Sequence, residues 1–386
     1  MRKALLENYG LARGYFTLNP REEHDVYLGP RSRDADLSIG HLRRTMRAER
    51  APKAIVYGVF GVGKTQFTYY VMHKLSDLSR SVYVECPPFH RRSRFTELHN
   101  VIMRRLGREY VLSLLDKAFA STGGSRSLSK TLNLEEDLVS TIRSGFESDH
   151  RALLWRYLTG EKLKSSEVDG IDAVRAQIYE DDAVSILNSV ALQVKAFESK
   201  QLLLFIDEIE NTEPLSGDSL GMFREALRGL VDEGNSVGVV FTASGREMAD
   251  LPVCITDESV KRRIGMPNYI NFKEYTHDEL KQFIHEVIQY RRAKDFDASS
   301  AARRVRVPGE NVTVLSYPFT EEAISSIVLA VTNLRDTGQT DAVRPKEALS
   351  VMDNALAYAL EKRAPAIDSQ LVSVVSKVQE TEEVEK

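Results

Sequence analysis

The sequence has few of the features that mark secreted, zinc-binding or membrane proteins. It contains only two cysteines, Cys86 and Cys254, which lie far apart and outside CxxC spacing. This indicates neither a disulfide framework nor a zinc site, and we expect both thiols to be buried as small apolar side chains. No apolar run approaches about twenty residues, and the N-terminus lacks the apolar stretch of a signal peptide. We therefore expect a cytoplasmic protein without membrane contact.

A large excess of one charge is also missing. The chain has 52 Lys and Arg against 56 Asp and Glu, a formal net charge of −4, which argues against a globally basic nucleic-acid coat protein. Its eight histidines show no spacing typical of metal ligands. What the chain does have is length: 386 residues, 42% of them hydrophobic, are enough for two or three packed domains.

Strand and helix patterns alternate over residues 51–266. Short β-branched runs, "KAIVYG", "SVYVEC", "LLLFID" and "VGVVFTAS", are separated by segments with apolar residues at helical spacing. This alternation predicts an α/β fold, a parallel sheet covered by helices. Residues 1–50 are predicted to be a helical lead-in. The polar, turn-rich stretch at about 107–181 is predicted to be a helical insertion in this core.

The pattern becomes helical beyond residue 266. Thr276 and Glu279 have capping-box spacing at the start of one helix, and Pro345 is placed to begin another. These signals predict a helical lid over residues 267–364. Residues 365–386 are predicted to be an acidic tail, and we expect its end, "VQETEEVEK", to be disordered because it is weakly hydrophobic.

A glycine-rich loop follows the first predicted strand. "GVFGVGKT" satisfies the Walker A pattern, and it lies between a strand and a helix, as phosphate binding requires. Glycines let the backbone N–H groups turn toward phosphate oxygens, and the helix N-terminus adds positive potential. We expect Lys64 to reach the outer phosphates and Thr65 to bind Mg²⁺. The predicted ATP-binding residues here are Gly58, Val59, Phe60, Gly61, Val62, Gly63, Lys64, Thr65 and Gln66.

Two adjacent acids follow the strand "LLLFI". A nucleotide with bound Mg²⁺ requires a carboxylate at the tip of a neighbouring strand, and hydrolysis requires a base that polarises water. We predict that Asp207 is the metal ligand and Glu208 the catalytic base. Strands that end in solvated acids are common, and only the Walker A motif nearby favours the catalytic interpretation.

Taken in order, these motifs resemble those of AAA+ ATPases. Walker A, the "DE" pair, the strand end "FTAS", the segment "DESVKRRIGMPNYINFKEYTHDELKQFI" and the helix start "VRPKEAL" follow one another as in that family. The pattern is most similar to the initiator clade: origin-recognition and replication-initiator ATPases, with related transposition-regulator ATPases. The resemblance covers residues 50–364 apart from the insertion. It implies a P-loop core with a helical lid, ATP hydrolysis with Mg²⁺, and a homo-oligomeric ring or filament.

The resemblance also implies roles for single residues. Arg263, with Arg262 as the second choice, resembles the arginine finger that a subunit offers to its neighbour's nucleotide. Arg344 resembles the sensor 2 arginine of the lid, and Thr242 or Ser244 occupies the sensor 1 region, where the usual asparagine is missing. Two further departures are Glu85, where an asparagine often restrains the catalytic glutamate, and the short stretch after the lid, which leaves no room for a winged helix.

The function is predicted to be an oligomeric ATP-driven switch that recruits or remodels a protein partner in a DNA-linked process such as replication, transposition or defence against mobile elements. DNA contact could come from the basic loop that contains Arg91, Arg92 and Arg94, although a solvated loop or an intersubunit contact fits it as well. One alternative is a signalling or defence NTPase that gates an effector without touching DNA. Another is an ATP-binding scaffold that hydrolyses little.

Overall fold

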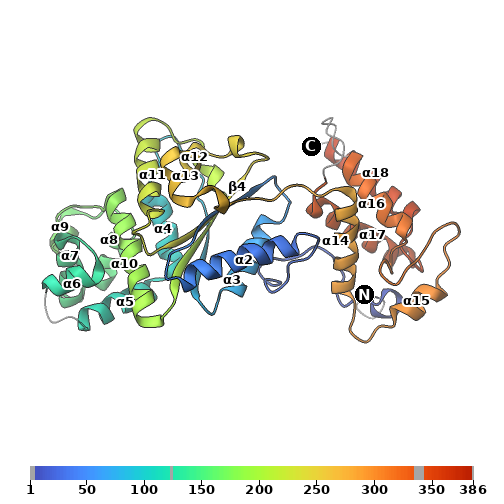
Figure 1. Cartoon of the computed structure of the whole chain (residues 1–386), viewed down its shortest axis with the longest axis horizontal. Coiled ribbons are helices and arrows are strands. Elements are labelled where there is room, and N and C mark those ends of the chain that lie inside the picture. The colour runs from blue at the N-terminus through green and yellow to red at the C-terminus, as the bar shows by residue number, and fades with distance from the viewer. Residues whose placement is uncertain (1–4, 122–124, 334–342, 385–386) are drawn as a thin grey trace. The chain divides into compact units, whose positions relative to one another are not determined.

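The computed structural model describes residues 5–121, 125–333 and 343–384. Its sheet has five parallel strands in the order β2-β3-β4-β1-β5 among the described residues (Figure 1). The strands are β1 Lys53–Gly58, β2 Ser79–Glu85, β3 Gln201–Asp207, β4 Gly238–Ser244 and β5 Tyr269–Asn271. The predicted α/β sheet and its first four strands are confirmed, whereas β5 was missed because it is only three residues long and half-buried.

The central strands are apolar throughout because helices cover the sheet. All six residues of β1 are buried, and so are the last six of β3. A parallel sheet buried on both faces needs such continuous apolar runs in place of alternation. Helices α4 (Phe95–Leu106) and α10 (Glu180–Glu198) pack on β2 and β3, and α13 (Glu258–Ile264) packs on β1. Both cysteines are buried, as predicted.

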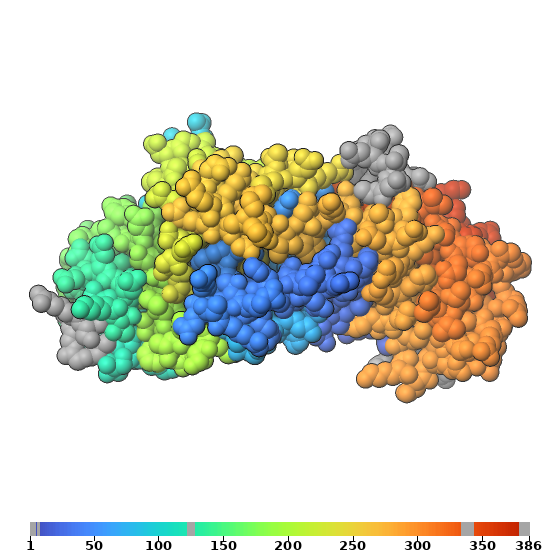
Figure 2. Space-filling view, viewed as in Figure 1, coloured from blue at the N-terminus to red at the C-terminus, as the bar shows by residue number. Residues whose placement is uncertain are grey.

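The region predicted as an insertion folds as helices that share the core of the sheet. Gly107, with φ +94°, separates α4 from α5 (Arg108–Ala120). Helices α5 and α6 pack on α10, and Figure 1 shows the whole block beside it. The remaining helices around the sheet are α2 Ser32–Arg47, α3 Lys64–Lys74, α5 Arg108–Ala120, α6 Ser125–Leu132, α7 Glu136–Glu147, α8 Arg151–Leu158, α9 Ser165–Asp169, α11 Gly217–Leu230 and α12 Val253–Thr256. The exposed residues of α2 form part of the surface drawn in blue in Figure 2.

The predicted lid is helical. Thr276 caps α14 in the predicted capping box, and Pro345 is the first residue of α17. The helices are α14 His277–Arg291, α15 Ala298–Arg304, α16 Glu321–Asn333, α17 Pro345–Lys362 and α18 Ser369–Val384. Short 3-10 or π turns complete the chain: η1 Leu5–Tyr9, η2 Ile209–Thr212, η3 Met248–Asp250 and η4 Met266–Asn268.

The segment predicted as an acidic tail instead forms α18. This helix packs on α16 and α17, because Val372 and Val375 provide a buried apolar side that the acidic composition of the segment concealed. The last two positions, 385 and 386, lie outside the described residues. The tail is therefore helical where Val372 and Val375 pack, and the disorder expected of its end, "VQETEEVEK", stays a prediction.

Contacts divide the chain into two units. One contains Met1–Leu37, Val59–Tyr70 and Phe272–Lys386, and the other contains Ser38–Gly58 and Val71–Asn271. The first unit thus joins the N-terminal segment and the glycine-rich loop to the lid, a grouping that differs from the predicted boundaries. Tyr9, Leu11 and Phe16 are buried in the same apolar cluster as the lid helices.

Candidate nucleotide-binding site

The glycine-rich loop has the curled conformation that phosphate binding requires. Gly61 and Gly63 have φ of +86° and +97°, which L side chains rarely adopt, so the two glycines are needed at these positions. The amide of Phe67 donates to the carbonyl of Gly63 at 2.9 Å, which closes the first turn of α3. The Lys64 ammonium bends back to the carbonyl of Val59 at 3.1 Å. A cation and a helix N-terminus are thus presented at one turn.

The N-terminal segment supports this loop from the side. The Gln66 side-chain amide donates to the carbonyls of Glu23 and Val26, at 2.8 and 2.7 Å. Tyr27 stacks on Tyr70 with 5.7 Å between ring centroids and meets Phe67 edge-on at 6.1 Å. Gln66, predicted to bind nucleotide, therefore uses its side chain to hold the N-terminal segment. Sequence patterns gave no sign of this, because no periodicity links the two segments.

The start of α17 lies against the same loop. A Cβ on Gly61 would come within 3.4 Å of the Lys346 Cβ and 3.6 Å of the Arg344 Cβ, and the Lys346 ammonium lies 4.4 Å from the centre of the Phe60 ring. Arg344 pairs with Glu274 at 3.4 Å and with Glu347 at 3.5 Å. The predicted sensor 2 residue is therefore next to the predicted phosphate loop.

Asp207 ends β3 as a buried carboxylate with several donors around it. The Tyr83 hydroxyl donates to Oδ2 at 2.7 Å, and the Thr242 hydroxyl donates to Oδ1. The backbone amide of Glu208 contacts both Oδ1 of Asp207, at 3.1 Å, and the Thr242 hydroxyl, at 3.3 Å. These donors fix the orientation of the carboxylate. Tyr83 was not predicted here, because only the register of β2 against β3 brings it to Asp207.

Glu208 has the properties of a carboxylate held ready to accept a proton. Its backbone is left-handed, with φ +58° and ψ +45°, which turns the chain sharply after the strand. Burial raises its pKa, the nearby charges of Glu85, Asp207 and Glu210 raise it further, and a hydrogen bond with the Asn211 side chain opposes them. A raised pKa makes a carboxylate a stronger base near neutral pH.

The carboxyl ends of the strands share one edge of the sheet. Asp207 is in register with Glu85, and Ser244 is in register with Gly58, the last residue of β1 and the first of the glycine-rich motif. Because Ser244 ends β4 at this edge, its position suits a sensor 1 residue. Thr242, one of the two predicted candidates, is engaged with the Asp207 carboxylate.

The phosphate loop therefore follows β1 directly, the acidic pair ends β3, and the lid arginine lies beside the loop. The order of these elements along the chain is the one expected from the sequence, and the roles of their residues stay predictions. The chain has an α/β fold with a parallel sheet and a glycine-rich loop after its first strand.

Neither a protein-family model nor a curated protein sequence matches the chain. Solved structures similar to it include Cdc6p of Pyrobaculum aerophilum, at 14% identity over 95% of this chain and 68% of that one, with a TM-score of 0.48. The ORC1 protein of Aeropyrum pernix, solved in complex with DNA, is 14% identical over 91% of this chain and 65% of that one, with a TM-score of 0.45. The RuvB Holliday junction branch migration motor of Thermotoga maritima is 12% identical over 91% of this chain and 70% of that one, with a TM-score of 0.41. The chain spans about two thirds of each.

The two candidate finger arginines lie on α13 and differ in their surroundings. Arg263 forms an ion pair with Asp232 at 2.9 Å and donates to the carbonyl of Ser259 at 3.0 Å. Arg262 is exposed, and no side-chain contact involving it is found within the described residues. The assignment stays a prediction, but the geometry leaves Arg262 the more available of the two.

The predicted basic loop is partly committed to internal contacts. Arg94 forms a bidentate pair with the buried Glu180, with both N–O distances 2.7 Å. Arg91 is exposed but donates to the Ser216 hydroxyl at 2.9 Å, and Arg92 is exposed. Arg94 therefore joins α4 to α10, and Arg91 and Arg92 are the arginines of this loop that are exposed to solvent.

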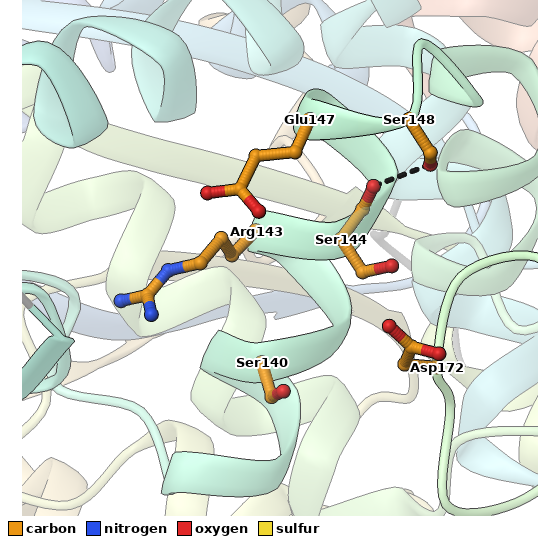
Figure 3. Close-up of a pocket in the computed structure, with 6 residues that line it drawn as sticks. All are labelled: Ser140, Arg143, Ser144, Glu147, Ser148 and Asp172. Carbon is orange, nitrogen blue, oxygen red and sulfur yellow. Dashed lines mark hydrogen bonds between the residues drawn. The ribbon is translucent and has the colours of Figure 1, made fainter.

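A shallow cavity of about 370 Å³ lies elsewhere, on α7. Figure 3 shows Arg143 and Glu147 pointing away from Asp172 along this helix. None of the predicted nucleotide-binding residues lines it. Among the described residues, no group of three or more His, Cys, Asp or Glu forms a metal cage, and no described helix is long and apolar enough to cross a membrane.

Proposed function

We propose that the chain binds ATP with Mg²⁺ and hydrolyses it. The observation that carries this proposal is the curled loop with Lys64, which directly follows β1. In the same sheet, β4 lies between β1 and β3. Strand β3 ends in Asp207 and leads into Glu208. Lys64 and the backbone amides of the loop would bind the phosphates, and Glu208, with its raised pKa, would take the proton of the attacking water. Arg344, beside the loop, would respond to the nucleotide.

The donor chemistry fits Mg²⁺. Thr65 and Asp207 offer a hydroxyl and a carboxylate, the hard oxygen ligands that this ion prefers. Mg²⁺ usually keeps several waters and nucleotide oxygens as its other ligands. Bound Mg²⁺ would neutralise charge on the transferring phosphoryl group.

Turnover of ATP by the purified chain tests this proposal. Glu208→Gln should abolish hydrolysis while ATP binding persists, because the amide keeps the shape but cannot accept the proton. Lys64→Ala should abolish binding. A chain that hydrolyses little, the scaffold alternative, would show the same low rate with and without Glu208→Gln.

We further propose a homo-oligomer in which an arginine of α13 completes the neighbouring site. A guanidinium supplied by another subunit makes hydrolysis depend on assembly. The motif order favours Arg263, which is paired with Asp232, whereas the exposed side chain supports Arg262, the second choice.

Mixing two inactive variants would identify the finger. Lys64→Ala retains its arginines but binds no ATP, and Arg262→Ala binds ATP but lacks one arginine. If Arg262 acts on the neighbouring subunit, the mixture should recover activity that neither variant has alone. Arg263→Ala, tested in the same way, is the matched comparison. Recovery with Arg263→Ala and full activity of Arg262→Ala would assign the role to Arg263.

A DNA-linked task is the leading proposal for the biological role, with recruitment or remodelling of a protein partner as its output. The support is the exposed pair Arg91 and Arg92 on the segment after β2. The double variant Arg91→Ala/Arg92→Ala should weaken salt-dependent binding to duplex DNA, whereas Arg50→Ala, an exposed control that precedes β1, should not.

The alternative is an NTPase that gates an effector protein without DNA. It is favoured by the pair of Arg94 with the Glu180 carboxylate, which lowers the free positive charge of the loop, and by the net charge of −4. Absence of DNA binding at low salt, in the presence of a slowly hydrolysed ATP analogue, would decide for this alternative.

A further inference from the structure

Asp207 is held between hydroxyl groups from both neighbouring strands of the sheet. Strand β3 lies between β2 and β4, and Asp207, its last residue, is buried, with 4% of its surface exposed. From β2, the Tyr83 hydroxyl donates to Oδ2 at 2.7 Å. From β4, the Thr242 hydroxyl donates to Oδ1, which also accepts the backbone amide of Glu208 at 3.1 Å. The two oxygens of this carboxylate therefore have different hydroxyl donors.

The place of Tyr83 follows from the pairing of β2 with β3. These parallel strands pair Tyr83 with Phe205 and Glu85 with Asp207. Alternate residues of a strand point to the same face, so Tyr83 shares a face of the sheet with Phe205 and Asp207. Tyr83 is thus the diagonal neighbour of Asp207, two residues away along the strand, and its side chain is long enough to reach the carboxylate. Its ring is half-buried, whereas Glu85 is exposed.

The two oxygens of Asp207 are not equivalent for a metal ion. Each oxygen of an ionised carboxylate has two lone pairs, so the whole group has about four acceptor positions. Oδ1 already accepts two donors, the Thr242 hydroxyl and the Glu208 amide. A cation that binds Asp207 therefore has to approach Oδ2. Of the two hydroxyls, that of Tyr83 is the one that holds this oxygen.

We propose that Tyr83 is a positioning residue for the metal ligand: its hydroxyl fixes Oδ2 of Asp207 as the oxygen presented to Mg²⁺ and so sets the affinity of the site for this ion. This inference rests on the proposed role of Asp207 as a ligand of Mg²⁺. Because Mg²⁺ requires nearly ideal octahedral geometry, a carboxylate that can rotate binds it less well. Tyr83 itself touches neither the nucleotide nor the ion in this account.

Thr242 and Tyr83 have different tasks in this arrangement. The Thr242 hydroxyl also accepts the backbone amide of Glu208, at 3.3 Å, so it joins Asp207 to the start of the turn that carries the proposed base. Its removal should disturb both acids and slow catalysis at every Mg²⁺ concentration. The Tyr83 hydroxyl acts on the oxygen that is presented to the ion. Its removal should therefore weaken Mg²⁺ binding, and an excess of Mg²⁺ should reverse the effect.

The test compares Tyr83→Phe with Tyr110→Phe in the full chain. Tyr110→Phe is a matched control, because the Tyr110 hydroxyl on α5 also donates to a carboxylate, that of Glu198 on α10, at 2.8 Å. Titration of Mg²⁺ into the protein with a fluorescent, slowly hydrolysed ATP analogue measures the affinity for the ion without turnover. Tyr83→Phe should raise the Mg²⁺ concentration at half-saturation about 10-fold or more, the usual effect of removing a group that orients a metal ligand. Tyr110→Phe should leave it at the native value.

Steady-state kinetics separate this role from a general loss of structure. At limiting Mg²⁺, the kcat of Tyr83→Phe should fall with the lost metal affinity, and at saturating Mg²⁺ it should return to within about twofold of the native value. The KM for ATP, measured at saturating Mg²⁺, should not change. Thr242→Val should stay slow at both concentrations. The thermal unfolding temperature establishes that each variant is folded.

Three outcomes would overturn the inference, and they distinguish its failure from that of the proposed function. If Asp207→Asn weakens Mg²⁺ binding but Tyr83→Phe binds the ion with native affinity, Tyr83 does not position the ligand, and the assignment of Asp207 stands. If Asp207→Asn binds Mg²⁺ as the native chain does, Asp207 is not the ligand, and the inference fails together with that assignment. An equal loss of affinity in Tyr110→Phe would assign the effect to packing and not to the hydroxyl of Tyr83.

Discussion

The buried ion pair between Glu23 and Arg291 offers a direct test of how the N-terminal segment is attached. The side chains are only 1% and 2% exposed. Arg291 binds both oxygens of Glu23 and donates to the carbonyls of Phe16, at 3.4 Å, and Thr17, at 2.8 Å. Arg291→Met would remove all of these donors and leave a carboxylate without its main partner.

The size of the effect follows from what remains around Glu23. Removing one member of a buried pair typically costs about 3–5 kcal/mol, because the other charge is left uncompensated. Arg13 still contacts Oε1 of Glu23 at 2.9 Å, and the amide of Asn19 contacts Oε2 at 3.0 Å. We therefore expect the lower end, about 3 kcal/mol of unfolding free energy. Arg13→Met is the control: it removes a 41% exposed partner of the same carboxylate and should cost about 1 kcal/mol or less.

Denaturant unfolding of the two variants, and of Glu23→Leu/Arg291→Met, measures these differences. The double variant should be more stable than Arg291→Met, since it contains no unpaired buried charge. Burial raises the pKa of Glu23, but the hydrogen bond and charge of Arg291, the Asn19 amide and Arg13 outweigh it and lower the pKa overall. The pair therefore stabilises the native chain above about pH 4.3, the unfolded value, and the contribution is lost as pH falls through the lower folded value. If Arg291→Met costs no more than Arg13→Met, the reasoning is refuted.

Three further variants test other parts of the structure. Gly61→Ala should weaken ATP binding and cost about 1–2 kcal/mol of stability, because φ is +86°, which L side chains rarely adopt; calorimetry and a binding titration measure both effects. Thr242→Val should lower kcat about 10-fold or more and leave the free energy of unfolding nearly unchanged, because the Asp207 carboxylate loses an orienting donor. Steady-state kinetics at saturating Mg²⁺ measure kcat, and a kcat equal to that of the native chain would contradict this prediction. Burial lowers the pKa of Lys53 to about 7, well below its unfolded value, so the unfolded chain binds the proton more strongly and native stability should rise with pH from about 7 to 10. Unfolding of Lys53→Met over that range should show a flatter dependence.

The parts of the fold that depend on local patterns could be predicted from the sequence. The strand before the glycine-rich loop, the acidic pair after β3, the capping box at Thr276 and the helix start at Pro345 all follow from residue type and spacing. Each of these signals lies within a few residues of the feature it predicts. The α/β sheet follows from their alternation.

The parts that depend on contacts between distant residues could not be predicted. Glu23 and Arg291 are 268 positions apart, and no periodicity connects them. Tyr83 reaches Asp207 only through the register of two strands, and Asn211 reaches Cys86 only through the fold of the turn. The helix after residue 368 was missed for a different reason, because two buried valines in an acidic segment give a weak apolar pattern.

The support of the phosphate loop by residues 23–27 affects how deletions of the first part of the chain should be interpreted. Without those residues Gln66 would lose both of its carbonyl acceptors, and the rings of Phe67 and Tyr70 would lose Tyr27. A shortened chain that begins near α2 would then fail to retain nucleotide even though every motif residue is intact. In a genetic screen, such a truncation would suggest that the first residues bind a partner. The actual cause would be the loss of the contacts that support the glycine-rich loop.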